Sequence, residues 1–110
     1  MRKLMASLVV VALLGVAAAQ ALAATRSVRV GDNFFVGRGH HTITVRRGAT
    51  VRFHWTGSNV HDVHARRGPV HFRSSVMSSG TFAKRLTRRG RYLIVCDIHP
   101  RKMRLTIRVR

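Results

Sequence analysis

Acidic residues are almost absent from this 110-residue chain, which has three aspartates against 21 lysines and arginines and a formal net charge of +18. Such a field attracts anionic surfaces, so acidic proteins and anionic lipid headgroups are the expected kinds of partner. The charge says nothing about the fold. The three aspartates are Asp32, Asp62 and Asp97.

Cysteine is equally scarce, since Cys96 is the only one and an intrachain disulfide is therefore excluded. A single cysteine is a buried structural thiol, an intermolecular bridge, a reactive thiol or a metal ligand. His61 and His64 would make half of a zinc site, but the chain has no second cysteine and no acidic cluster to complete it.

Long apolar runs are missing except at the start, where residues 4–19 follow Arg2 and Lys3 and lead to Ala21, Leu22 and Ala23. This order is typical of a secretory signal peptide, and the run is short for a membrane span. We predict a signal peptide over residues 1–23, with Ala21 as the other candidate end and an uncleaved anchor as the alternative. The protein would then be periplasmic or secreted, and nucleic acid would not be a partner.

The remainder, residues 24–110, is predicted to form one domain with a net charge of +16, because removal of Arg2 and Lys3 leaves 19 basic residues against three aspartates. No helical period of 3.6 residues appears in it, whereas alternating apolar residues separated by turn signals recur along its length. This pattern predicts an antiparallel β-sandwich or barrel of about seven to eight strands. We expect strands near residues 27–35, 41–45, 50–55, 60–64, 81–86, 92–96 and 103–109, with a hairpin formed by the second and third.

The segment from Tyr92 to Val109 carries the chemistry, because Cys96, His99 and Met103 follow one another at short intervals. Alternation places Cys96 on the inward face of its strand, and Met103 on the inward face of the next. A thiolate, an imidazole and a thioether in one loop suit copper better than other common metals. A mononuclear copper site of this kind needs a second histidine from elsewhere in the chain.

His61 is the best candidate for that second histidine. His54 alternates with inward aromatic residues and should face solvent, and His40 and His41 lie in a glycine-rich turn. His61 lies between two valines, close to the start of a predicted strand. Its neighbours Asn59 and Asp62 either orient the ligands through hydrogen bonds or only shape the turn.

These residues give the chain a resemblance to the cupredoxins, in particular to the plastocyanin, pseudoazurin and amicyanin group. The similarity is carried by GDNFF at residues 31–35, NVHDV at residues 59–63, Gly80-x-Phe82, Gly90-x-Tyr92 and the Cys96, His99, Met103 loop. It implies a two-sheet Greek-key sandwich with one copper per chain. His61, Cys96 and His99 would be the planar ligands and Met103 a weak axial ligand. Tyr92 would resemble a tyrosine corner, with a hydrogen bond to the backbone.

The function implied is that of an exported type 1 (blue) copper protein, a monomeric one-electron carrier that serves an acidic redox partner and associates with anionic membrane surfaces. Two alternatives are a copper-binding or copper-delivery protein that does not cycle, and a metal-free module that docks on acidic surfaces. An enzyme is not expected, because one short domain does not supply the further copper centre of a multicopper oxidase.

Overall fold

The computed structural model describes residues 24–36 and 41–110, so the predicted signal peptide and its cleavage site lie outside the described residues. Within the described part, the regular structure consists of β-strands, and no helix there is long and apolar enough to cross a membrane. The strands are β1 (Thr25–Gly31), β2 (Phe34–Phe35), β3 (Thr42–Val45), β4 (Thr50–Trp55), β5 (His64–Arg67), β6 (Thr81–Arg85), β7 (Gly90–Val95) and β8 (Arg104–Val109).

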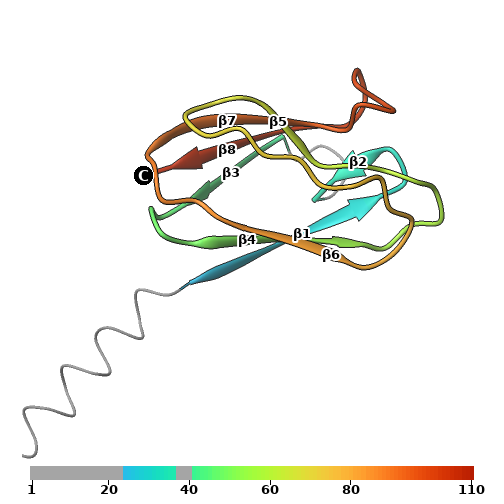
Figure 1. Cartoon of the computed structure of the whole chain (residues 1–110), viewed down its shortest axis with the longest axis horizontal. Coiled ribbons are helices and arrows are strands. Elements are labelled where there is room, and N and C mark those ends of the chain that lie inside the picture. Colours follow the sequence, from blue (N-terminus) through green and yellow to red (C-terminus); the bar gives the residue numbers. More distant parts are fainter. Residues whose placement is uncertain (1–23, 37–40) are drawn as a thin grey trace, which may run out of the picture.

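Two four-stranded sheets face each other, one in the order β2-β1-β4-β6 and the other in the order β3-β8-β7-β5 (Figure 1). The predicted β-sandwich is confirmed. The chain changes sheet at every connection except β1–β2 and β7–β8. As a result each sheet is mixed and not purely antiparallel, since β1 pairs with β4, and β3 with β8, in parallel.

The predicted hairpin between residues 41–45 and 50–55 is wrong. These strands are β3 and β4, and they belong to different sheets. The intervening Arg46-Arg47-Gly48 turn carries the chain from one sheet to the other, with Gly48 in the left-handed region at φ +92°. A turn sequence specifies a reversal of the chain, but it does not specify whether the two strands pair.

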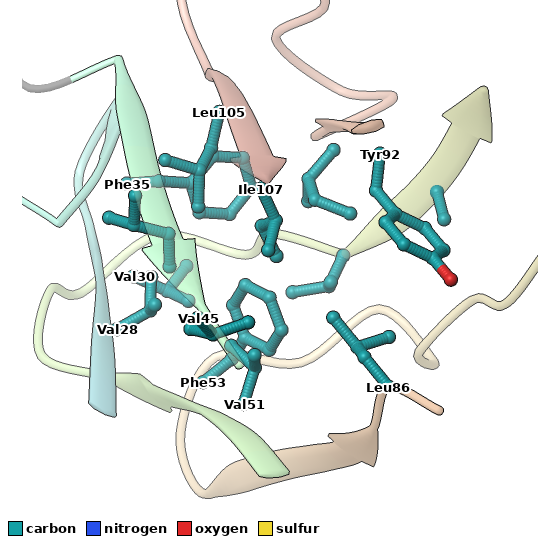
Figure 2. Packing of buried hydrophobic residues seen from close by; sticks show 14 of the residues in the cluster. Val28, Val30, Phe35, Val45, Val51, Phe53, Leu86, Tyr92, Leu105 and Ile107 are labelled. Carbon is teal, nitrogen blue, oxygen red and sulfur yellow. The ribbon is translucent and has the colours of Figure 1, made fainter. Parts of the chain in front are cut away.

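The core lies between the sheets and is built by period-2 alternation (Figure 2). Val28 and Val30 of β1 and Phe53 of β4 are fully buried on one side, as are Leu105 and Ile107 of β8 on the other. Burial of an aliphatic or aromatic side chain of this size contributes about 1.5–3 kcal/mol, so the core holds the strands in register.

The short strand expected at residues 60–64 is displaced, because β5 spans His64–Arg67 instead. Val60 is 48% exposed, and His61 forms an isolated bridge with Met77. The amide of each residue donates to the carbonyl of the other at 2.9 Å. The segment between β5 and β6, which contains Met77, therefore supplies the hydrogen bonds that a neighbouring strand would have supplied.

The sandwich has two distinct ends (Figure 1). One end, called here the site end, carries the β1–β2 turn, the segment before β5 and the β7–β8 loop. The opposite end carries the β3–β4 and β6–β7 turns, the start of β1 and Arg110. Near this opposite end the Tyr92 hydroxyl donates to the Arg88 carbonyl at 2.8 Å, so the predicted hydrogen bond to the backbone is present. Burial raises the pKa of Tyr92, with Arg88 opposing the shift, so the phenol remains a donor.

Candidate metal centre

Cys96 directly follows β7 and is fully buried, on the same face as Tyr92 and Ile94, as its parity predicted. The chain then turns tightly, because the His99 amide donates to the Cys96 carbonyl at 3.1 Å and the Met103 amide to the His99 carbonyl at 3.0 Å. This turn brings Nδ1 of His99 to 3.8 Å from the Cys96 sulfur. The short Cys-x-x-His spacing thus puts two donors side by side.

His61 reaches the same point from a distant part of the chain. Its Nδ1 lies 3.9 Å from Cys96 Sγ, its side chain is fully buried, and its ring centroid is 5.1 Å from that of His99. The donor atoms of His61, Cys96 and His99 all lie within 4.8 Å of one another. The structure therefore brings together three of the four predicted ligands.

The two sulfur–nitrogen separations fit a single metal ion. Zinc, taken as representative of first-row divalent ions, bonds imidazole nitrogen at about 2.0–2.1 Å and thiolate at about 2.3 Å. One ion can bond both atoms only if they lie closer than the sum, about 4.4 Å. Both observed sulfur–nitrogen separations meet this limit. Two imidazoles and one thiolate form the donor set typical of a blue-copper site.

Met103 is fully buried beside this cluster, and its carbonyl accepts a hydrogen bond from the Cys96 amide at 3.1 Å. The predicted inward orientation of its side chain is confirmed, as are those of Leu105, Ile107 and Val109, which are also buried. Its role as an axial ligand stays a prediction. Met77 lies half-buried against the core.

Asp32 is the residue at the site that the sequence did not reveal. Its Oδ1 lies 3.1 Å from Nε2 of His61, and its two carboxylate oxygens accept the amides of Ser58 and Asn59 at 3.0 Å. Those amides, followed by His61, lower the pKa of Asp32 to about 2. An ionised acceptor at Nε2 holds the proton on that nitrogen and leaves the lone pair of Nδ1 facing Cys96.

Asp62 joins the two ligand segments, because its buried carboxylate accepts the Asp97 amide at 2.7 Å. Asp62 directly follows His61, and Asp97 directly follows Cys96. Of the two roles left open for Asp62, the ligand-orienting one is therefore supported. Asn59 contributes through its backbone amide to Asp32.

Asp97 extends the network outward, with Nδ1 of His64 at 2.8 Å and guanidinium nitrogens of Arg66 and Arg73 at 2.8 and 2.6 Å. Partial burial acts to raise the pKa of Asp97, but Arg66, His64 and Arg73 together hold it below its usual value. All three acidic side chains of the chain thus lie next to the candidate ligands.

His99 is the ligand candidate nearest to solvent, and it is only half-buried. With Asn33, Asn59, Pro100, Arg101 and Lys102 it lines a shallow concavity on the surface. The other described histidines, which are His41, His54, His64 and His71, are outside the three-donor cluster, and His40 lies outside the described residues.

Comparison with solved structures shows that this architecture is the cupredoxin fold. A reduced mutant of amicyanin superimposes with a TM-score of 0.67 at 21% identity, over 78% of this chain and 82% of that one. The Cu(I) form of another amicyanin mutant gives a TM-score of 0.65 at 22% identity, over 80% of this chain and 82% of that one. The Cu-containing nitrite reductase (NirK) from Thermus scotoductus SA-01 gives 0.63 at 23% identity, over 76% of this chain but only 22% of that larger protein.

Sequence comparisons add nothing further, since no model of a protein family matches the chain and no curated protein matches it significantly. At identities below 25% the structural likeness establishes the fold. The resemblance drawn from the sequence is confirmed at that level.

Proposed function

We propose that this chain is an exported blue-copper protein that carries single electrons, with His61, Cys96 and His99 as copper ligands and Met103 as a weak axial ligand. The observation that carries the proposal is the convergence of two imidazole nitrogens and one thiol sulfur within 4.8 Å. Bound copper would supply the one-electron chemistry, cycling between Cu(II) and Cu(I) at one ion per chain. Amicyanin has been captured in both reduced and oxidised states, which supports this assignment.

The chain's own residues would keep the site rigid and dry. Cys96 and His61 have no solvent exposure, which excludes water from the donor atoms. Asp32 orients His61, and the Asp62 carboxylate ties the segment of His61 to that of Cys96. A cage that does not rearrange between oxidation states suits electron transfer, and the fully packed core behind it resists such movement.

Half-buried His99 would be the route by which electrons enter and leave. Arg101 and Lys102 are exposed beside it and would favour an acidic redox protein as the partner. This assignment gives the domain no catalytic role and needs no second subunit to complete the site.

The decisive experiment is titration of the purified protein with Cu(II). We expect one equivalent to produce the intense visible thiolate-to-copper band, followed by a reversible one-electron wave in voltammetry. Cys96→Ser and His61→Ala should lose the band, because a serine hydroxyl stays protonated and alanine has no donor. His54→Ala is the matched control and should keep it, since His54 lies on β4 outside the donor cluster.

Absence of the band with Cys96 reduced and intact would overturn the proposal and favour a metal-free docking module. A band without a reversible wave would instead favour copper binding or delivery without redox cycling.

A further inference from the structure

The end of the sandwich opposite the candidate metal centre carries a concave cluster of arginines, called here the arginine pole. Arg46 and Arg47 come from the β3–β4 turn, Arg89 from the β6–β7 turn, and Arg110 from the end of β8. Together with Thr44 and Val45 they line one concavity, and all four side chains are exposed.

The backbone beneath the arginine pole is held in place by hydrogen bonds. The Arg47 amide donates to the Arg110 carbonyl at 2.8 Å, and the Arg110 amide donates to Val45 at 2.9 Å. The two turns are joined where the Gly48 amide donates to the Leu86 carbonyl at 2.7 Å. The arginines are therefore presented together by a fixed framework, and only their side chains need to be ordered by a ligand.

No acidic side chain compensates these charges. The chain has three acidic residues, and all of them lie at the site end, where they pair with His61, His64, Arg66 and Arg73. Within residues 24–36 and 41–110, none of the ion pairs involves the arginine pole. Charged residues can also serve only to protect sheet edges from aggregation or to keep a protein soluble. Neither role requires four arginines to line one concavity.

The attachment point of the N-terminal segment is at the same end. β1 begins here, with Thr25 opposite Thr50, and the Thr50 amide donates to the Ala24 carbonyl at 3.0 Å. Ala24, where the described part of the chain begins, is therefore held beside the arginine pole. Figure 1 shows this end, marked by the C label and the start of β1, on the far side of the molecule from the β7–β8 loop.

We propose that the arginine pole docks on an anionic phospholipid surface, with the phosphate headgroups as its ligands. Guanidinium groups bind phosphate through paired N–H donors, and clustered arginines near a negative bilayer add their attractions. In this orientation the half-buried His99 faces away from the bilayer and stays open to a soluble partner. The proposal does not depend on copper, so it can fail or hold independently of the proposed function.

The test compares two variants of equal charge for binding to phosphatidylcholine vesicles, with and without phosphatidylglycerol, by sedimentation. Arg46→Gln/Arg47→Gln/Arg89→Gln neutralises three charges of the arginine pole. The matched control, Arg101→Gln/Lys102→Gln/Arg104→Gln, neutralises three exposed charges at the site end. Both are made in the full chain, so any contribution of residues 1–23 is the same in each.

We expect the wild-type protein to bind the vesicles that contain phosphatidylglycerol more tightly than vesicles of phosphatidylcholine alone. Each arginine near such a surface contributes about a fivefold gain in binding, so the first variant should bind about a hundredfold more weakly while the control keeps most of its affinity. Thermal melts that match the wild type would show that both variants are folded.

Three results would overturn the proposal. Equal losses in the two variants would mean that net charge alone drives binding, and unchanged binding of the first variant would exclude the arginine pole. Saturable binding of inorganic phosphate in calorimetry without vesicles, lost in the first variant, would reassign the concavity to a soluble anion.

Discussion

Asp62→Ala is expected to loosen the candidate metal centre by cutting the connection between its two ligand segments. The side chain of Asp62 is 1% exposed, and the Asp97 amide that it accepts lies at 2.7 Å. A hydrogen bond to a charged group contributes about 1.5–3 kcal/mol, and its loss also leaves that amide without its acceptor. The Arg73 contact at 3.4 Å adds little, because the arginine is 56% exposed.

We therefore expect Asp62→Ala to lower the free energy of unfolding of the metal-free protein by about 2–3 kcal/mol, a large part of the stability of a small domain. Asp62→Asn is the matched control, because its amide oxygen can still accept the Asp97 N–H, and it should lose about 1 kcal/mol. Urea denaturation measures both free energies of unfolding. The slope of the unfolding free energy against urea concentration should be the same in the wild type and both variants.

The same pair of variants tests the link to the site. A residue that orients metal ligands typically changes metal affinity about 10- to 100-fold when it is removed, so Asp62→Ala should hold copper that much more weakly while Asp62→Asn stays close to the wild type. If the two variants have the same unfolding free energy and the same copper affinity, the Asp62–Asp97 hydrogen bond does not support the site and our reasoning is wrong.

Three further predictions concern the ligands and charges around the centre. Met103→Leu should leave a coloured but spectrally shifted copper site, because the axial bond is weak and the other three donors remain; complete loss of copper binding would contradict that role. Charge reversal at Arg101 and Lys102 changes the local charge by four units and should lower the reduction potential, since each unit charge at about 10 Å in an effective dielectric of about 40 contributes roughly 0.8 kcal/mol, or some tens of millivolts, before screening. The same change should flatten the salt dependence of electron transfer to an acidic partner. A wild-type transfer rate that is indifferent to salt would refute this account of the basic loop. Finally, Asp32 has its pKa lowered from 3.8 to about 2, so its stabilising effect on the metal-free protein should be present above about pH 4 and lost as the pH falls toward 2. The difference in unfolding free energy between the wild type and Asp32→Asn, measured by denaturation, should narrow over that range; a difference that stays constant would contradict the argument that the amides of Ser58 and Asn59 and the His61 ring stabilise the ionised carboxylate.

The sequence by itself determined which side chains point inward and which donors lie next to each other along the chain. Alternation in the last two strands placed Cys96 and Met103 on their buried faces, because a strand has a fixed period of two. The turn from Cys96 to His99 is also local, closed by a hydrogen bond between residues three apart. Such features depend on neighbouring residues only, so the pattern of the sequence contains them.

The pairing of strands was decided by the tertiary structure. The alternation in β3 and β4 is equally compatible with a hairpin and with two strands in opposite sheets, and packing of the whole core selects the second. The position of β5 was also decided by the tertiary structure. The amide of His61 donates to the carbonyl of Met77, which lies in a segment without alternating apolar residues, so the sequence pattern could not indicate this pairing.

Polar contacts between residues far apart in the chain could not be predicted from the sequence either. Asp32 lies 29 residues from His61, and nothing in a Gly-Asp-Asn turn indicates which imidazole its carboxylate will meet. The sequence also does not indicate that the three aspartates lie at one end of the sandwich and the arginine pole, which has no acidic side chain beside it, at the other. Both depend on which turns the folded sandwich brings to each end, and that is set by the packing of its two sheets.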